Sequence, residues 1–346
     1  MKHHYLKEPI RPINLEKIRT ISELLEAFSR TSFQSRTLAA CADIYVSMLE
    51  DKDRPTIFLG LAGAMVPAGM KGVVSTMVKK NMVDVIVSTG ANMYHDVVEA
   101  LGEHHYLGSP EADDVLLHDE GIDRIYDTYA DESRFRMVDN MIMSHADELA
   151  EEGVTGISSR FFLESLGKFI DGKGSTEDKK QSIVWNCWKS NIPIFVPALS
   201  DSSIGLALTQ HYIGHLEKKE KPIVIDEIKD NYEIFQFKKE APKTGVIYVG
   251  GGVPKNYIQQ TAYLQDLFGM PDAEHDYGFQ LTTDSPQWGG LSGCTFKEGF
   301  SWGKEGPGGK YTACYCDATI ALPLIVKATL ERCKSLGKRE RLNIKF

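Results

Sequence analysis

The sequence has few of the features that carry a protein into a membrane or onto nucleic acid. Its longest hydrophobic run near the C-terminal end, residues 320–326, is interrupted by Pro323 and is too short to span a bilayer. The first residues are polar and lack the hydrophobic region of a signal peptide. No strongly basic block occurs, and the formal net charge is −9. We therefore expect a cytoplasmic protein that binds neither membranes nor nucleic acid and favours small cationic partners.

Short motifs of several enzyme classes are also missing. The six cysteines are scattered without a Cys-x-x-Cys pair, which favours reduced and mostly buried thiols. Neither the Gly-x-Gly-x-x-Gly fingerprint nor the Walker lysine motif occurs, and the absence of a nucleophile elbow argues against a hydrolase. We identify neither a His-x-x-x-His spacing nor a clustered carboxylate spacing, and therefore expect no metal site.

The chain does have the composition of an ordinary globular protein, with 42% hydrophobic and 25% charged residues in a length of 346. No linker or internal repeat divides it, so we expect one domain over residues 1–346. Its N-terminal segment, residues 1–52, is expected to be helical. Ile21, Leu24, Leu25 and Phe28 follow helical spacing there, and a second such series lies between residues 38 and 48.

From residue 56 onward, short hydrophobic runs alternate with longer helical patterns. This alternation predicts an α/β fold in which a central, mostly parallel sheet is flanked by helices on both faces. One helix is expected to end at about Lys79 and another at Leu101, and residues 133–190 are expected to be largely helical with a polar loop at residues 171–177. The expected strands are residues 56–59, 83–87, 192–195, 245–249, 277–281 and 311–315.

Small or glycine-rich loops follow four of these strands, at residues 60–64, 88–92, 197–203 and 250–253. Ligands of open parallel sheets bind beyond the carboxyl ends of the strands, where helix N-termini favour phosphate groups. These loops make a nucleotide or dinucleotide cofactor reasonable. Tight turns that need glycine for steric reasons are the other interpretation, and the loops alone do not decide between them.

A lysine with unusual neighbours stands ahead of the last expected strand. Lys304 follows Trp302 and Gly303 and comes six residues after Glu298, and a Gly/Pro turn is expected at residues 306–309. Surroundings that desolvate an ammonium group can lower its pKa and make a lysine nucleophilic for imine chemistry. An ordinary exposed turn lysine is the other interpretation, and the local sequence alone favours it.

Among the histidines, His95 is expected near the start of a helix, after a glycine-containing turn, where it could face a cleft. His104 and His105 follow the expected end of that helix, and we expect them to cap it or to be solvated.

Six ordered motifs give the chain a family resemblance. They are the run of residues 57–60, the run 82–90, the run 192–201, Gly-Gly-Gly-Val-Pro-Lys at 250–255, Ser-Trp-Gly-Lys at 301–304 and Cys-Asp-Ala at 316–318. Together they resemble the deoxyhypusine synthase family over roughly residues 20–335.

The resemblance implies a Rossmann-like domain that binds NAD and a homotetramer with active sites at dimer interfaces. It further implies that NAD oxidises a polyamine such as spermidine to an imine and that an enzyme lysine captures the aminobutyl group as a Schiff base. Lys304 matches that lysine, Trp302 the indole of the polyamine site, and Glu298 a carboxylate that holds the cationic substrate. The positions matching cofactor contacts are Gly63, Ala64, Thr89, Gly90, Ala91, Asp201, Gly250, Gly251, Thr283, Ser292, Asp317 and Ala318.

The chain departs from the family pattern at several pocket positions. His95, Leu206 and Leu291 stand where the family has acids that bind substrate. Asn256 replaces a histidine, Trp288 replaces a cofactor-site acid, and Gly63-Ala64 replace a Ser-Asn pair. Each buried ammonium of a polyamine needs a paired acceptor, so these losses imply a rebuilt substrate pocket.

The leading hypothesis is thus an NAD-dependent transferase that moves an aminobutyl-type group between small amines, as in homospermidine synthesis. A true deoxyhypusine synthase, which modifies a lysine of translation factor 5A, is the first alternative. A non-catalytic homologue that binds NAD is the second.

Overall fold

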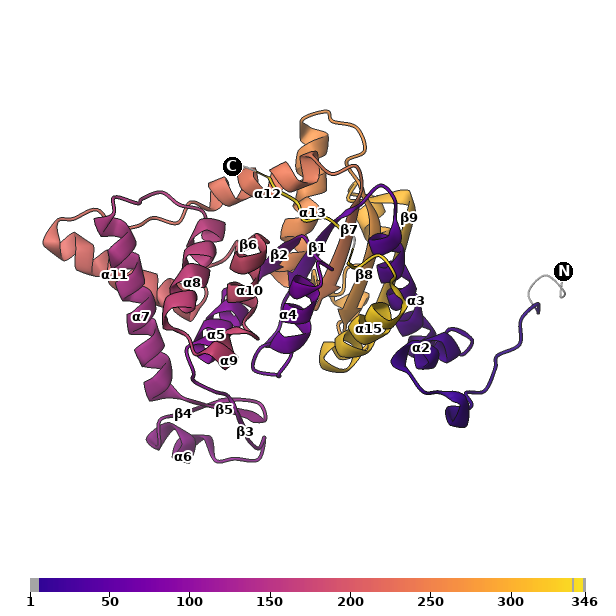
Figure 1. Cartoon of the computed structure of the whole chain (residues 1–346), viewed down its shortest axis with the longest axis horizontal. Helices are drawn as coiled ribbons and strands as arrows, with labels where there is room; N and C mark the ends of the chain where they lie inside the picture. The colour runs from indigo at the N-terminus through magenta and orange to yellow at the C-terminus, as the bar shows by residue number, and fades with distance from the viewer. Residues whose placement is uncertain (1–5, 338, 345–346) are drawn as a thin grey trace.

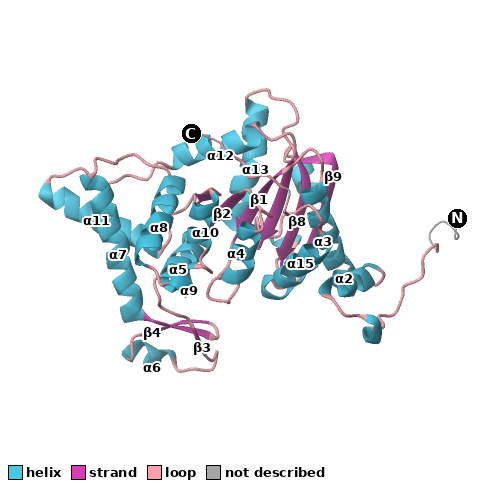
Figure 2. Cartoon of the chain, in the orientation of Figure 1, coloured by secondary structure: helices cyan, strands magenta, loops and turns pink. Residues whose placement is uncertain are grey.

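The computed structural model describes residues 6–337 and 339–344, and its centre is a parallel sheet of six strands (Figures 1 and 2). Their order across the sheet is β6-β2-β1-β7-β8-β9, and every neighbouring pair is parallel. Taken in chain order this is 3-2-1-4-5-6, the strand order of the Rossmann fold. The strands are β1 (Thr56–Leu61), β2 (Val85–Ser88), β6 (Ile194–Phe195), β7 (Thr244–Val249), β8 (His275–Thr282) and β9 (Glu305–Tyr315).

Alternate strand residues enter two separate cores because successive side chains of a strand point to opposite faces. In β1, Leu59 belongs to the larger core and Phe58 to the smaller one; in β7, Ile247 and Val246 divide in the same way. Helices that contribute to the larger core include α3 (Phe33–Glu50), α4 (Lys71–Lys79), α5 (Gly90–Ala100), α10 (Ile183–Ser190) and α15 (Ala318–Arg332). The smaller core is covered by α12 (Glu227–Lys239), α13 (Gly252–Leu267) and α14 (Phe296–Phe300). The expected α/β sheet with helices on both faces is confirmed.

Further helices lie beyond the β6 edge of the sheet, on the left of Figure 1. They are α7 (Glu132–Glu151), α8 (Ser159–Lys173), α9 (Thr176–Lys179) and α11 (Ser203–Lys218). Below α7 lies a second, antiparallel sheet, in the order β3-β5-β4, that the sequence pattern did not predict. It consists of β3 (Tyr106–Leu107), β4 (Ile122–Ile125) and β5 (Thr128–Asp131), accompanied by α6 (Asp114–Asp119). Among the described residues, no helix is both long and apolar enough to cross a membrane.

The helical N-terminal segment begins later than expected. Residues 6–14 are not helical, a short 3-10 turn η1 (Leu15–Lys17) follows, and α2 (Ile21–Ser29) precedes α3. A capping box between Thr20 and Glu23 fixes the start of α2. The two predicted amphipathic helices are thereby confirmed, while residues 1–5 of the predicted segment lie outside the described residues.

The helix predicted to end at about residue 79 is confirmed as α4. It starts only at Lys71, because Gly63 and Gly69 adopt positive φ angles that end regular structure between them. One local prediction was wrong. The Gly/Pro turn expected at residues 306–309 lies inside β9. The sheet accommodates these residues by an irregularity, in which pairing passes from His275–Glu305 directly to Tyr277–Lys310.

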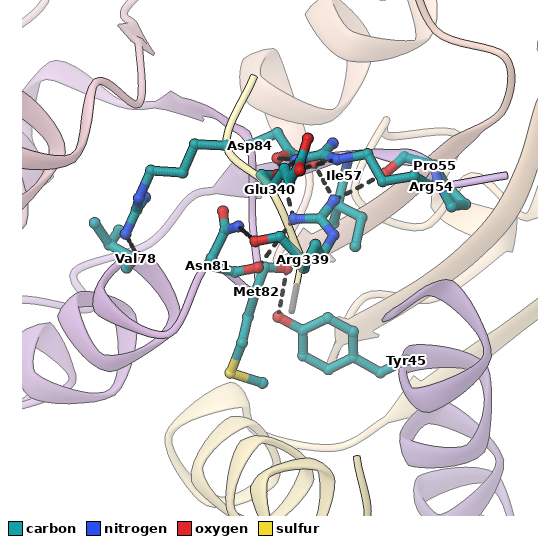
Figure 3. A network of polar contacts seen from close by, with 11 residues as sticks. Tyr45, Arg54, Pro55, Ile57, Val78, Asn81, Met82, Asp84, Arg339 and Glu340 are labelled. Atoms are coloured by element: carbon teal, nitrogen blue, oxygen red, sulfur yellow. Dashed lines mark hydrogen bonds and ion pairs between the residues drawn. The ribbon is translucent and has the colours of Figure 1, made fainter. Parts of the chain in front are cut away.

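The segment after α15 returns to the amino ends of β1 and β2 (Figure 3). There the guanidinium of Arg339 donates to both carboxylate oxygens of Asp84 and to the backbone oxygens of Asn81 and Pro55. Asp84 is buried, also pairs with Arg54 at 2.8 Å, and accepts from the backbone N–H of Ile57 at 2.8 Å. This network ties the C-terminal segment to the central strands.

Candidate functional site

The strand order reverses between β1 and β7, and the loops after these two strands form the edge where a Rossmann-type sheet binds ligands. Gly63 and Ala64 follow β1 and are exposed, while Gly250 and Gly251 follow β7. A Cβ atom at Gly251 would overlap the Cα of Ser292, so only glycine allows the loop before α14 to approach so closely. The predicted cofactor positions 63, 64, 250, 251 and 292 are thus brought to one place.

Asn92, which sequence reasoning missed, fastens the loop after β1 to the loop after β2. Its Oδ1 accepts from the backbone N–H groups of Met65 and Val66 at 3.1 and 3.3 Å. Its Nδ2 donates to the Gly63 carbonyl at 2.7 Å and to Thr89 Oγ1 at 3.1 Å. Since Asn92 is buried, these four bonds determine the shape of the exposed Gly63-Ala64 loop.

Gln280 and Lys255 similarly fasten the loop after β7 to the loop before α14. The Gln280 amide nitrogen donates to the carbonyls of Gly250 and Ser292, both at 2.8 Å. Lys255 donates from Nζ to Gln280 Oε1 at 2.9 Å and to the Cys294 carbonyl. Burial lowers the pKa of Lys255. Gln280 also escaped the sequence analysis, because a polar residue within a hydrophobic strand carries no motif.

The remaining predicted cofactor positions lie at the same carboxyl edge. Gly90 begins α5 and packs against Ser202, next to Asp201 in the loop after β6. Thr283 follows β8, and Asp317 with Ala318 follows β9. Ser202 is the N-cap of α11, and Asp317 caps α15.

Helix N-termini at this edge differ in how they are capped. The side chains of Ser202 and Asp317 cap α11 and α15. The N-cap positions of α5 and α13 are Thr89 and Gly251, and neither supplies a side-chain cap. Uncapped N–H groups at the start of a helix favour an anion such as a phosphate. The small residues, the uncapped helices and the exposed acids Asp201 and Asp317 together fit a dinucleotide.

Lys304 lies at the opposite end of the sheet, directly before β9. Its Nζ atom is 3.5 Å from Oδ1 of Asn256 on α13 and 5.6 Å from the ring centroid of Trp302. The Lys304 side chain is half-buried, while 65% of Trp302 is exposed, so the indole offers its surface to a ligand or a partner. Asn256 also lines a groove of about 950 Å³ between α12 and α13. The structure therefore brings three of the predicted catalytic and substrate residues together.

Glu298 lies on α14, six residues ahead of Lys304. Its Oε2 accepts from the backbone N–H and the hydroxyl of Thr295 at 2.8 and 3.1 Å, as the acid of a capping box. These hydrogen bonds lower the pKa of Glu298, which keeps this exposed carboxylate ionised. It remains available to a cationic group through its other oxygen.

A second carboxyl group, that of Glu305, was not predicted as a site residue, because it lies one position beyond the Ser-Trp-Gly-Lys motif. It is buried, and its Oε1 accepts from the amide nitrogen of Gln259 at 2.7 Å. Burial raises the pKa of Glu305 to about 7, against the opposing influence of Gln259 and of the charges on Lys255 and Lys304.

His95 belongs to a different cluster. Its Nδ1 is 2.9 Å from Nε2 of His105, whose Nδ1 donates to Glu99 at 2.6 Å, and Lys71 pairs with the other Glu99 oxygen. The prediction that His105 caps the helix or is solvated was wrong, since only 5% of its side chain is exposed. Burial, and then His105, lowers the pKa of His95 to about 4, so its imidazole is neutral near pH 7.

The central sheet separates His95 from Lys304. His95 is on α5, whose apolar residues join the larger core, whereas α13 and α14 cover the smaller one. From β2, which precedes α5, to β9, which follows Lys304, there are four strand spacings, or about 19 Å. One copy of the chain therefore does not unite all the predicted substrate residues.

Two histidines four residues apart on α11, His211 and His215, approach Asp147 on α7 and form a possible metal-ligand group. This His-x-x-x-His spacing is visible in the sequence and was overlooked. However, His211 Nε2 accepts from the backbone N–H of Ile223 at 2.9 Å, so its Nδ1 carries the proton donated to Asp147 at 2.6 Å. With both nitrogens of His211 committed, we interpret the group as a structural tie, and the absence of a metal stays a prediction.

The sheet order and the crevice at its reversal point define a Rossmann-type α/β protein. Within that class the chain belongs to the deoxyhypusine synthase family, whose profile matches residues 23–329. This membership supports an aminobutyl-transferase-like activity.

Curated relatives extend over nearly the whole chain. It is 48% identical to "Probable deoxyhypusine synthase 2" of Methanosarcina acetivorans, covering 97% of this chain and 94% of that protein. It is 40% identical to "Probable deoxyhypusine synthase 1" of the same organism, covering 96% and 97%. The "Deoxyhypusine synthase-like protein" of Chlorobaculum parvum is 39% identical, covering 98% and 94%.

Among solved structures, one provisionally assigned as a deoxyhypusine synthase of Entamoeba histolytica matches with a TM-score of 0.63. The alignment covers 94% of this chain and 98% of that one, at 17% sequence identity. This likeness bears on the fold.

Proposed function

We propose that the chain is an NAD-dependent transferase that moves an aminobutyl or similar aminoalkyl group between small amines through an imine on Lys304. The donor would be a di- or polyamine or a guanidino-amine, and homospermidine-type synthesis is one such reaction. The observation that carries the proposal is the placement of Lys304 between Asn256 and Trp302. The backbone N–H of Lys304 donates to the carbonyl of Gly299, the residue after the ionised Glu298.

Each of these residues has a part in the proposed chemistry. Bound NAD would supply the oxidation of the amine to an imine and the final reduction. Lys304, as a neutral amine, attacks the imine carbon; a bond to Nζ forms, the bond to the departing amine breaks, and that amine takes up the proton. Trp302 stacks on the aminoalkyl chain or its cation, and Glu298 offsets positive charge. The acceptor amine then displaces Lys304 by the reverse exchange.

The carboxyl edge supports NAD as the cofactor. Uncapped α5 and α13 would hold the pyrophosphate, and Gly63, Ala64, Gly250 and Gly251 would allow its close approach. Thr89, Gly90, Ala91, Asp201, Thr283, Ser292, Asp317 and Ala318 complete the proposed set of cofactor residues.

The residues of the proposed substrate pocket support an amine substrate different from the one that the family pattern implies. Leu206 and Leu291 stand at positions where the family resemblance expects substrate-binding acids, and 63% and 41% of their surfaces are exposed. His95 is neutral near pH 7, so it cannot replace a carboxylate as a counter-ion. A pocket with fewer negative charges suits a donor or acceptor that carries fewer positive charges than a triamine.

The separation of His95 from Lys304 supports an oligomer. In the proposed homotetramer, a second copy would bring its own His95 and cofactor loops to the Lys304 side of the first. Exposed Trp302, Trp288 and Phe300 are suited to be covered at such an interface.

Borohydride trapping tests the proposal. Purified protein is incubated with NAD and a panel of amines, NADH formation is followed, and the imine is trapped and located by mass spectrometry. We expect an adduct on Lys304 that is lost in Lys304→Ala and Lys304→Arg but kept in Lys297→Ala, a nearby exposed lysine. Undiminished turnover of both Lys304 variants without a trapped adduct would reject the mechanism.

The same assay separates the alternatives. Modification of a lysine in a translation factor 5A precursor, in preference to small amines, would identify a true deoxyhypusine synthase. Tight NAD binding without NADH formation from any amine would identify a non-catalytic homologue.

A further inference from the structure

Glu305 is a buried carboxyl group for which the proposed reaction has so far no use. Only 1% of its surface is exposed, and Oε1 accepts from Gln259 Nε2 at 2.7 Å. Oε2 is buried and has no hydrogen-bond partner among the described residues. An unpartnered carboxyl oxygen is costly to bury, so its retention calls for an explanation.

Lys304 and Glu305 reach the same face of α13. Lys304 Nζ approaches Asn256, and the Glu305 carboxyl group binds Gln259, three residues and thus about one helical turn further on. The other side of the carboxyl group is closed by α14, where a Cβ atom at Gly299 would overlap Oε2. Glu305 therefore lies beneath the segment that carries Glu298, Trp302 and Lys304.

Few other charges surround this carboxyl group. Of the two cations that lower the pKa of Glu305, Lys255 on α13 has the larger effect. Its Nζ is already bonded to Gln280 and the Cys294 carbonyl. Lys304 is the other cation that acts on it. The further titratable groups facing this region from the packed elements are Glu298 on α14, Cys294 in the preceding loop, Tyr248 on β7 and Tyr311 on β9.

We infer that Glu305 is the buried counter-charge of Lys304, which sets how much of this lysine is a neutral nucleophile and stabilises the cationic imine formed on it. The inference rests on the proposed role of Lys304. Glu305 acts through Lys304 and not on the substrate, and is therefore a positioning residue.

The chemistry of Lys304 gives such a residue a purpose. Lys304 must lose a proton before it attacks, and the protonated imine that follows again carries a positive charge at Nζ. A nearby carboxyl group that is neutral in the first state and negative in the second keeps the net charge of the buried region constant. Because burial brings its pKa to about 7, Glu305 can exist in both forms near neutral pH.

Trace labelling with acetic anhydride tests the inference without NAD or an amine. The acetylation rate of Lys304, relative to exposed Lys80 in the same digest, is measured by mass spectrometry from about pH 6 to about pH 8.5. Glu305→Gln keeps the shape and a hydrogen-bonding group but cannot become negative. We expect its labelling to match the native protein near pH 6 and to exceed it by about three- to tenfold near pH 8.5, where native Glu305 is ionised and retains the ammonium.

Glu240→Gln, a change of an exposed acid at the end of α12, is the matched control and should leave the profile unchanged. An equal change at both pH values would indicate a structural role, and superimposable profiles would show that Glu305 serves Lys255 alone; either result overturns the inference. If Glu305→Gln does not fold, Gln259→Met removes the donor to Oε1 instead. This variant should shift the change in Lys304 labelling to a higher pH. An unchanged pH dependence would reject the inference.

Because labelling needs no turnover, a positive result stands even if no amine is oxidised. Conversely, an imine trapped on Lys304 with no effect of Glu305 on labelling would retain the proposed function and reject this inference.

Discussion

Nζ of Lys304 lies 3.5 Å from Oδ1 of Asn256. This contact joins the residue before β9 to the second turn of α13. The two residues are 48 positions apart in the chain. A carboxamide oxygen at this distance can orient an amine without neutralising it. The family resemblance expects a histidine at this position, so the neighbour of the lysine has changed from a titratable group to a neutral one.

Replacing Asn256 should therefore slow imine formation while leaving the cofactor edge intact. We expect Asn256→Leu to reduce the rate of the borohydride-trapped adduct about three- to tenfold, since one weak hydrogen bond orients Nζ. NAD affinity, measured by calorimetry, should be unchanged. Gln260→Leu, at an exposed position further along α13, is the control. An adduct rate equal to that of the native protein would remove Asn256 from the site.

Asn92 should be essential for the loop after β1. Asn92→Ala removes both acceptor bonds to Met65 and Val66 and both donor bonds to Gly63 and Thr89. We expect a loss of about 2–4 kcal/mol in the free energy of unfolding, measured by urea denaturation, because buried N–H groups lose their partners. NAD affinity should fall by at least about tenfold.

Asn140→Ala, at an exposed position on α7, controls for the substitution itself and should alter neither quantity. Full NAD affinity in Asn92→Ala would show that the Gly63-Ala64 loop does not contact the cofactor.

Arg339→Met should destabilise the protein strongly. Asp84 is buried between Arg339 and Arg54, and removal of one partner leaves much of its charge uncompensated. We expect a loss of about 3 kcal/mol in the free energy of unfolding, measured in urea. Arg134→Met breaks a pair at 3.7 Å between an exposed arginine and the partly buried Glu103, and should cost less than about 1 kcal/mol. Equal losses in the two variants would show that the C-terminal segment contributes little.

His95 should make the protein sensitive to mild acid. Burial lowers its pKa from 6.5 to about 4, so below about pH 6.5 the unfolded chain takes up a proton that the folded one refuses. The contribution of His95 to the free energy of unfolding is fully present above pH 6.5 and falls as the pH drops towards 4. Between about pH 7 and pH 5 the loss should reach about 2 kcal/mol.

Urea denaturation at both pH values measures this effect, and His95→Gln should reduce the acid-induced loss. His118→Gln changes a histidine whose side chain is 90% exposed and should leave it unaltered. A native-like pH response of His95→Gln would contradict the assignment.

Sequence patterns predicted the parts of the fold that depend on local hydrophobicity. The run at residues 245–249 became β7 because a strand covered on both faces is apolar throughout. The small antiparallel sheet was not predicted, since its strands have two to four residues and are partly exposed. The residues at 306–309 resemble a turn in isolation, and only pairing with β8 draws them into β9.

Contacts between distant residues limited the prediction of the site. The motif identified Lys304 but not its approach to Asn256, and nothing local marks Asn92 or Gln280 as the organisers of the two loops. Glu305 was missed for the same reason, because its burial depends on α13 and α14. The pairing of His95 with His105 depends on the chain turning back after α5.

The bond between Arg339 and Asp84 also bears on when the molecule can reach its final state during synthesis. The two residues are 255 positions apart, and Asp84 leaves the ribosome long before its second arginine exists. Until then, the amino ends of β1 and β2 must accommodate a carboxylate for which Arg54 is the one remaining cationic partner among the residues that the structure describes. Nascent chains should consequently stay loosely packed around β1 and β2, and consolidation of the fold should follow translation rather than accompany it.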